Sequence, residues 1–381
     1  MSSQERGLMY GYYIFVGRGD WGTSREKTLD PTFDGNVATA NLGDWGVHRK
    51  GTELKDAPEW SSAWDLGTWK AHIDFLVDEL GADMITLLMN GFELPYSSAL
   101  FPEAVELDHA NVRDDFLQDV LDYIRSRGVT LYVQFCTTGH AVGYARAHPD
   151  CTTISPNGTR HPSNLCHNNP GGRAYAVGVA QEVLQRYRGF GGVSFHPPEN
   201  AVPCHCPHCR AAFARTTGKD FDAATAQEIS DFYWASCMAF QREMERVALA
   251  LVPGVQVFCI TIPGQFERDF AVIGPEIPQS TILMHWDYWS YGPKIPDLLR
   301  SLHVYRSLGH RVGFIPTSGW NLEKLGATYG EQVVEQIEAV RAVGVPDLMY
   351  FLGAIWHEPS LRATSWKLHR PGRAAASNAR T

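Results

Sequence analysis

One short stretch, FHPPENAVPCHCPHCR at residues 195–210, carries both a carboxylate and a run of thiols. Glu199 stands five residues before Cys204, and Cys206 and Cys209 follow in a C-x-C-x2-C spacing. Cysteines this close can wrap a zinc ion in thiolates, and a carboxylate at a strand end can act as a general acid or base. The alternative is an ordinary polar loop. The functional interpretation requires the neighbouring elements to hold this stretch at a strand end, whereas an ordinary polar loop has no such requirement.

One pattern repeats along the chain: a short apolar run, a polar loop and an amphipathic helix. Strands are expected at 8–17, 82–90, 129–136, 191–197, 253–263, 280–290, 311–320 and 346–359. Helices are expected at 68–81, 112–128, 172–187, 225–252, 296–309 and 330–344. Nearly continuous apolar strands that alternate with helices indicate a parallel sheet, and eight such units predict an α/β fold, a (β/α)8 TIM barrel with long β-to-α loops. A doubly wound sheet is the alternative, but no glycine-rich phosphate turn follows the first strand.

The barrel is expected to span residues 1–365 as one catalytic domain. Residues 21–67 form a long loop excursion after the first strand, with the second of two GDWG copies inside it. Long loops on this face of a barrel are usually functional. Residues 366–381 are expected to be a flexible C-terminal tail.

Polar and aromatic residues gather where the predicted strands end, which is where barrel enzymes place their chemistry. Taken in strand order, these residues are Arg18, Asp20, Asn90, Glu93, Cys136, His140, His196, Glu199, His285, Trp286, Asp287, Ser318, Trp320, Trp356, His357 and Glu358. Carboxylates, imidazoles and indoles suit general acid–base work on a polyol substrate. The competing interpretation of any one of them is a loop cap or a salt bridge at the rim.

Composition narrows the class of partner. The net charge is −9 and no Lys/Arg-rich run occurs, which argues against nucleic acid as a partner. No apolar run approaches the ~20 residues of a membrane span, and no signal sequence opens the chain, so a cytoplasmic protein is expected. The 11 Trp residues suit either core packing or stacking on sugars. We therefore expect a carbohydrate partner, and nothing in the sequence predicts an oligomeric state.

The cysteine cluster has a fourth candidate member. Cys166, in the loop after the third strand, would complete four thiolates around a structural zinc, with His167, His205 and His208 as substitutes. The alternative is four reduced thiols. No GxGxxG turn, P-loop, GxSxG elbow or HExxH helix is found in a supporting context, so no cofactor is expected for catalysis.

One segment of the chain carries a resemblance to known barrels: LCHNNPGGRAYAVGVAQEVLQRYRGFGGVSFHPPEN…CHCPHCRAAF. It resembles glycoside-hydrolase-like TIM barrels, closely over residues 163–213 and elsewhere only in layout. The resemblance implies a carbohydrate-active barrel. In the large retaining clan, strands four and seven both end in Glu, but strand seven here ends in PTSGW. An alpha-galactosidase-like pairing would instead use Glu199 and Asp287.

The layout also resembles the inverting exo-sialidases of glycoside hydrolase family 156. That resemblance implies catalysis by an Asp after strand one and a His after strand three, which here are Asp20 and His140. The carboxylate of sialic acid calls for a guanidinium fork, and the candidates are Arg18, Arg146, Arg160 and Arg173. The prediction is thus a glycosidase acting on a terminal sugar, an exo-sialidase in its specific form. Its rival is a carbohydrate-binding barrel without catalysis.

Overall fold

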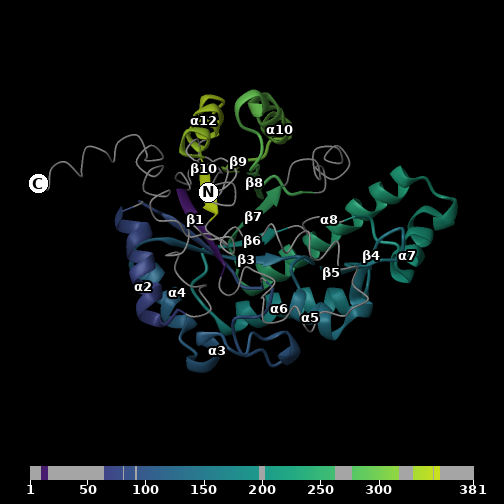
Figure 1. The fold of residues 1–381 in the computed structure, drawn as a ribbon, viewed down its shortest axis with the longest axis horizontal. Helices are drawn as coiled ribbons and strands as arrows, with labels where there is room; N and C mark the ends of the chain where they lie inside the picture. The colour runs from purple at the N-terminus through teal and green to yellow at the C-terminus, as the bar shows by residue number, and fades with distance from the viewer. Residues whose placement is uncertain are drawn as a thin grey trace, which may run out of the picture.

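Eight parallel strands close into a barrel, in the order β1–β2–β3–β6–β7–β8–β9–β10, which confirms the predicted fold (Figure 1). The strands are β1 (Tyr10–Phe15), β2 (Met84–Leu88), β3 (Thr130–Cys136), β6 (Gly192–His196), β7 (Gln256–Thr261), β8 (Ile282–Trp286), β9 (Val312–Ile315) and β10 (Asp347–Phe351). The computed structural model describes residues 10–15, 64–79, 81–90, 92–196, 202–261, 277–316, 329–345 and 347–351.

Helices cover the outside of this barrel. The longer ones are α2 (Leu66–Asp74), α4 (Leu117–Ser126), α6 (Pro170–Arg186), α8 (Ala226–Leu251), α10 (Ile295–Ser307) and α12 (Tyr329–Ala342). The shorter ones are α3 (Ala110–Asp114), α5 (Val142–Ala147), α7 (Pro207–Thr217), the 3-10 turns η5 (Pro102–Ala104), η6 (Pro149–Cys151), η7 (Phe221–Ala223) and η9 (Gly292–Lys294), and the π-turn η4 (Phe75–Glu79). Neighbouring helices pair as α2 with α4, α6 with α8, and α10 with α12 (Figure 1).

Alternate residues of each strand face opposite sides of the sheet, which gives two separate apolar cores. On β2, Ile85 and Leu87 pack in the larger cluster with the helices, whereas Met84 and Leu88 belong to a smaller cluster. The smaller cluster draws on six strands and fills the barrel interior. Cys136 belongs to it, so its thiol lies on the inner face of β3.

A glycine makes room for the Tyr132 ring inside the barrel. A Cβ built on Gly192 would lie 1.9 Å from Cε1 of Tyr132, so only glycine fits at the start of β6. The Tyr132 ring also contacts Phe258 of β7, with ring centroids 5.2 Å apart. The ring therefore fills space inside the barrel beside the start of β6.

The helix expected over 112–128 is broken in the structure. Asp115 adopts a left-handed conformation (φ 47°), which ends α3 at Asp114, and α4 begins at Leu117. The Asn111 side chain stabilises the break, because its Oδ1 accepts a hydrogen bond from the Leu117 N–H at 2.6 Å. Periodicity could not find this interruption, since the apolar face continues through it.

An extension beside the barrel was not predicted from the sequence. The short strands β4 (Thr152–Ile154) and β5 (Arg160–Leu165) form an antiparallel hairpin, which lies beside α7 away from the barrel (Figure 1). The His205 N–H donates to the Ile154 carbonyl at 2.7 Å, which joins the loop before α7 to the hairpin.

The amino end of the barrel carries a structural ion pair. The Arg311 guanidinium donates two hydrogen bonds to the Asp347 carboxylate, at 2.6 and 2.8 Å, and Asp347 is buried. An ion pair with this fork geometry at the amino end of a barrel serves stability rather than chemistry. This pair raises the pKa of Arg311 above its usual range.

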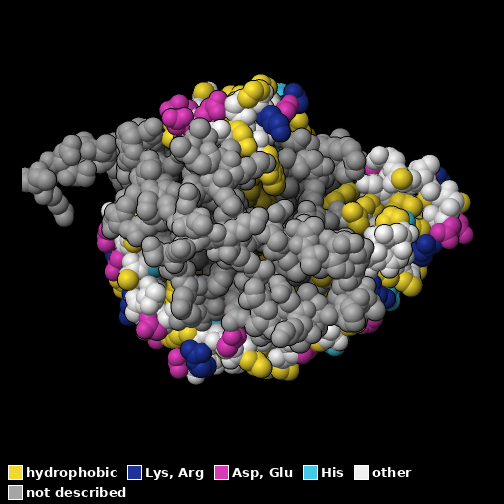
Figure 2. All heavy atoms as spheres, viewed as in Figure 1, with side chains coloured by type: hydrophobic (Ala, Val, Ile, Leu, Met, Phe, Trp, Pro, Cys, Tyr) yellow, Lys and Arg dark blue, Asp and Glu magenta, His cyan; other side chains and the backbone are white. Residues whose placement is uncertain are grey.

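The described surface mixes both signs of charge. Lys or Arg and Asp or Glu side chains are interspersed along the described margin of the face in Figure 2. None of the helices among the described residues combines the length and apolar character needed to cross a bilayer. Of the predicted segments, residues 21–63 of the loop excursion and the tail at 366–381 lie outside the described residues, and α2 begins within the excursion, at Leu66.

Candidate functional site

The carboxyl ends of β2, β3 and β6 are joined by side chains as well as by strand pairing. Cys136 and His196 are register partners on β3 and β6. The Asn90 side chain extends the pairing beyond β2, since its Nδ2 donates to the Cys136 carbonyl (3.0 Å) and its Oδ1 accepts from the Cys136 N–H (2.8 Å). Asn90, predicted to bind substrate, therefore holds the end of β3 in place.

His140 has the most unusual backbone at this end of the barrel. Its φ is +57°, a region that non-glycine residues rarely adopt and that often marks a functional site. The segment is fixed on both sides: Ala141 N–H donates to the Ser163 carbonyl (2.9 Å) and Leu165 N–H to the Thr138 carbonyl (2.7 Å). The conformation is therefore imposed by the hairpin strand β5.

Rings from the loop after β2 and from the end of β8 lie beside His140 and His196. The His140 ring lies 5.1 Å from Phe92 and 5.6 Å from His196, both edge-on. The His196 ring lies 5.4 Å from Trp286 at the end of β8, which in turn contacts Tyr288. Two predicted residues, His140 and His196, are thus brought together, with Trp286 beside them. We call this group (Cys136, His140, His196, Trp286) the mouth cluster.

A third histidine near His140 is held neutral. Burial, with a smaller contribution from His140, lowers the pKa of His161 to about 4. Its Nδ1 accepts hydrogen bonds from the N–H groups of Ser163 (3.2 Å) and Asn164 (3.0 Å). His161 therefore stabilises the turn of β5 that fixes the His140 segment.

The three described arginines that were predicted to bind substrate each contact a different group of the protein. Arg146 forms an ion pair with Glu93 at 2.7 Å, so two predicted substrate-binding residues are brought together, and burial lowers the pKa of Arg146. Arg173 pairs with Glu243 and lies over the Phe240 ring of α8. Arg160 donates to the Pro149 carbonyl at 2.8 Å. The structure does not bring Arg173 to the mouth cluster.

Asp287 serves the backbone of the loop after β8. Its Oδ1 accepts hydrogen bonds from the N–H groups of Trp289 and Ser290, both at 2.9 Å, and the residue is buried. These bonds make a tight turn of the kind that an Asp side chain stabilises. His285, on the same strand face, bonds Thr261 at 3.1 Å and contacts Tyr305 of α10, so it faces the helices.

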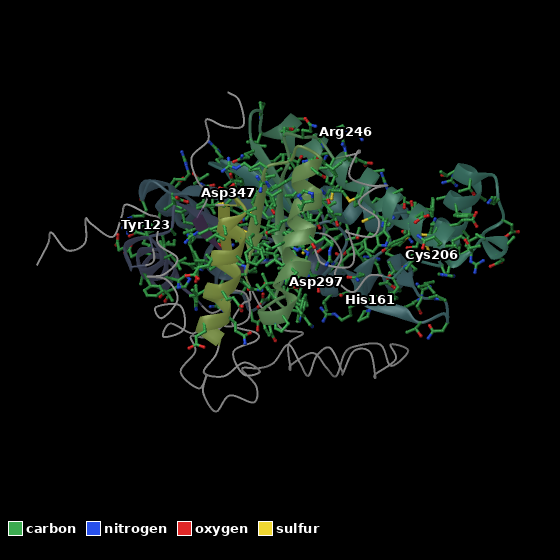
Figure 3. All side chains as sticks on the ribbon, turned by 90° about the horizontal axis from the view of Figure 1, so that it is seen from above. Tyr123, His161, Cys206, Arg246, Asp297 and Asp347 are labelled. Carbon is green, nitrogen blue, oxygen red and sulfur yellow. The ribbon has the colours of Figure 1, made fainter. Side chains whose placement is uncertain are left out.

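The four cysteines of the predicted metal site do converge. The sulfur atoms of Cys166, Cys204, Cys206 and Cys209 all lie within 4.8 Å of one another, and all four side chains are buried. Cys166 Sγ lies 3.5 Å from Cys206 Sγ and 3.4 Å from Cys209 Sγ. Figure 3 shows Cys206 in the extension beside the barrel rather than at its centre.

Backbone N–H groups point at these sulfur atoms. Ile154 N–H and Cys206 N–H donate to Cys204 Sγ at 3.3 and 3.4 Å, and Cys209 N–H donates to Cys206 Sγ at 3.4 Å. Contact with Cys166 lowers the pKa of Cys204 and of Cys206. Contacts among the same thiols raise the pKa of Cys166 and of Cys209. The fit to a tetrahedral zinc ion therefore rests on the convergence of four buried sulfur atoms.

Several predicted residues have no described position. They are Arg18, Asp20, Glu199, Ser318, Trp320, Trp356, His357 and Glu358, which lie outside the described residues. Among described residues, the sequence-based set of site residues omitted Phe92, Tyr288 and His161, and it gave Cys136 no role beyond its place at a strand end. Strand alternation offered a signal for Cys136, because Tyr132, Gln134 and Cys136 share one face of β3.

Known structures share this fold. The β-galactosidase from Bacillus circulans sp. alkalophilus is similar with a TM-score of 0.56 and 15% identity, over 80% of this chain and 53% of that chain. A GH20 catalytic module of the pneumococcal exo-β-D-N-acetylglucosaminidase is similar with a TM-score of 0.54 and 12% identity, over 97% and 88%. The chain thus spans about half the length of the β-galactosidase.

At these identities the likeness shows the fold, and it supports the resemblance to glycosidase-type TIM barrels at that level. No protein-family model and no curated protein matches the sequence.

Proposed function

We propose that this protein is a glycoside hydrolase that acts on a terminal sugar. The observation that carries the proposal is His140, an imidazole held with φ +57° beside aromatic rings at the carboxyl end of the barrel. Imidazole is the side chain that titrates nearest to neutral pH, so it can donate or accept a proton during bond cleavage. The barrels with similar folds named above include glycosidases, which agrees with the proposal.

In its specific form, the proposal is an inverting exo-sialidase that uses Asp20 and His140. Inversion needs one group to take a proton from water as it attacks the anomeric carbon, and another to assist the departing oxygen. Asp20 can act as the base or hold the imidazole in one tautomer, and the roles of the two residues stay unassigned. The alternative pairing of Glu199 with Asp287 is less favoured, because Oδ1 of Asp287 already caps a turn.

The substrate carboxylate would need a guanidinium. Arg146 and Arg173 are already paired with Glu93 and Glu243. Arg18 stands two residues before Asp20 in the sequence, so we assign it the substrate carboxylate.

The test is hydrolysis of a panel of aryl glycosides that includes an aryl sialoside. We expect turnover of the sialoside, and we expect Asp20→Asn and His140→Ala each to lower kcat/KM by roughly 100-fold or more, the usual scale for an acid–base group. His303→Ala, at an exposed site on α10, is the matched control. Hydrolysis of another glycoside with the same loss in both variants would keep the glycosidase and replace the sugar. Binding without turnover of any substrate would identify a carbohydrate-binding barrel.

We also propose that Cys166, Cys204, Cys206 and Cys209 hold a structural zinc ion and that catalysis needs no cofactor. Four thiolates fill a tetrahedral site and leave no position for a substrate. The ion would tie the end of β5 to the start of α7, because Cys166 follows β5 and Cys206 caps α7.

A further inference from the structure

We propose that Cys136, His140 and His196 form a second metal site, which binds Zn²⁺ in the barrel mouth and thereby inhibits the enzyme. Their ligand atoms, one sulfur and two ring nitrogens, lie within 4.8 Å of one another. Bonds of about 2.0–2.3 Å to one zinc ion would place these atoms about 3–4 Å apart, so small side-chain rotations complete the site.

The backbone brings the three ligands together. Cys136 and His196 are register partners at the last position of β3 and β6, so their side chains leave the sheet side by side on its inner face. His140 arrives from the loop after β3, where the left-handed conformation and the bonds to β5 fix its direction. All three side chains are buried, with 1%, 5% and 3% of their surface exposed in sequence order.

The donor set selects the ion. A thiolate with two imidazoles suits Zn²⁺ and disfavours Mg²⁺ and Ca²⁺, which prefer oxygen ligands. Binding would displace the thiol proton of Cys136. Three protein ligands leave a fourth position for water, in contrast to the four cysteines of the extension, which close their site.

Inhibition follows from the identity of one ligand, and this step rests on the proposed function. A ring nitrogen that binds zinc has committed its lone pair, so His140 could no longer exchange a proton there with water or substrate. The ion would also occupy space beside Trp286, whose ring contacts His196. We therefore expect zinc to compete with catalysis rather than to support it.

The binding test uses the full chain, a thiol-free reductant and equilibrium dialysis against buffered Zn²⁺, with the bound metal quantified. We expect the unchanged chain to bind one more equivalent of zinc than Cys136→Ser, and His196→Gln to match Cys136→Ser. Cys237→Ser, a buried thiol of α8 outside both clusters, should bind as much as the unchanged chain. Co²⁺ in place of Zn²⁺ should lose one thiolate charge-transfer band in Cys136→Ser.

Equal zinc binding by Cys136→Ser and the unchanged chain would overturn the site, provided that circular dichroism shows both proteins to be folded.

The inhibition test compares rates at fixed free Zn²⁺, and the rate of each variant is expressed relative to its own metal-free rate. The half-inhibitory zinc concentration should rise at least ~10-fold in Cys136→Ser, since even an outer-shell partner of a metal contributes that much. Zinc bound at these residues without loss of rate would overturn the inhibition. Absence of glycosidase activity would refute the proposed function alone, because the dialysis decides the site without substrate.

Discussion

His140 combines an unfavourable backbone with a useful side chain. The left-handed conformation costs a non-glycine residue about 1–2 kcal/mol, and here hydrogen bonds of β5 impose it. A residue is retained in such a conformation when its direction matters more than its contribution to stability. At the residue scale, the backbone of His140 therefore lowers the stability of the fold, whereas its side-chain direction serves the proposed function.

The strained backbone of His140 predicts an unusual order of stability between two variants at this position. His140→Gly and His140→Ala both remove the ring, but only glycine adopts a positive φ freely, so His140→Gly should be more stable by about 1 kcal/mol. At an ordinary position the order is reversed. Asp115 is the other described non-glycine residue with positive φ (47°), and it lies away from the mouth cluster. The pair Asp115→Gly and Asp115→Ala is therefore the control. Urea unfolding of both pairs is the measurement, and a more stable His140→Ala would contradict imposed strain.

Buried imidazoles predict how stability responds to acid. Burial lowers the pKa of His72 to about 3 and that of His285 to about 4. Above pH 6.5 both are neutral in either state. Below it the unfolded chain takes up protons that the folded chain refuses, so stability falls with pH by up to about 1.4 kcal/mol per unit for each group.

The loss should extend from pH 6.5 down to the folded pKa values. His72→Gln should therefore flatten the curve of unfolding free energy against pH, measured with urea between pH 7.5 and 5, whereas exposed His303→Gln should leave it unchanged. An unchanged slope in His72→Gln would refute the assignment of a neutral buried His72.

At the scale of elements, the cysteine cluster links a hairpin to a helix. Cys206 is the N-cap of α7, and its Sγ accepts from Cys209 N–H. Asn168 and His167 extend the link to Ser236 of α8, at 3.2 and 2.7 Å. Because β5 also fixes the His140 segment, the cluster supports the mouth indirectly.

Loss of one ligand should therefore reduce stability more than turnover. Cys206→Ser should lower the free energy of unfolding by about 3 kcal/mol or more, the upper range for one substitution, because it would remove a bond to the proposed zinc ion and a cap contact. Zinc content, urea unfolding and kcat of the folded fraction test this, with Cys237→Ser as control. Full loss of kcat at unchanged stability would show a catalytic rather than structural cluster.

The sequence predicted elements better than their interruptions. Apolar periodicity located the eight strands, because burial on both faces leaves a strong signal. It missed the break at Asp115, which depends on the Asn111 side chain bonding Leu117 N–H. It also missed the hairpin of β4 and β5, whose strands are short and polar and are held by contacts with distant segments such as His205.

At the scale of the whole molecule, barrel geometry explains which site predictions could succeed. Strand ends converge in any closed parallel barrel, so His140 and His196 could be placed together from sequence. Partners could not be predicted in the same way, since the Arg146–Glu93 pair and the turn capped by Asp287 depend on loop geometry. The sequence therefore predicted that these strand-end residues lie near one another better than it predicted the contacts that each of them makes.

The most direct test of the central claim is proton NMR of the first sugar formed during hydrolysis of an aryl α-sialoside. We expect β-sialic acid to appear first and to equilibrate later with the α anomer, and we expect His140→Ala to form neither at a comparable rate. Inversion requires a water molecule to attack the face opposite the departing group, and Asp20 and His140 are the proposed proton-transfer pair. First formation of the α anomer would contradict the inverting mechanism, and unchanged hydrolysis by His140→Ala would contradict the assignment of the site.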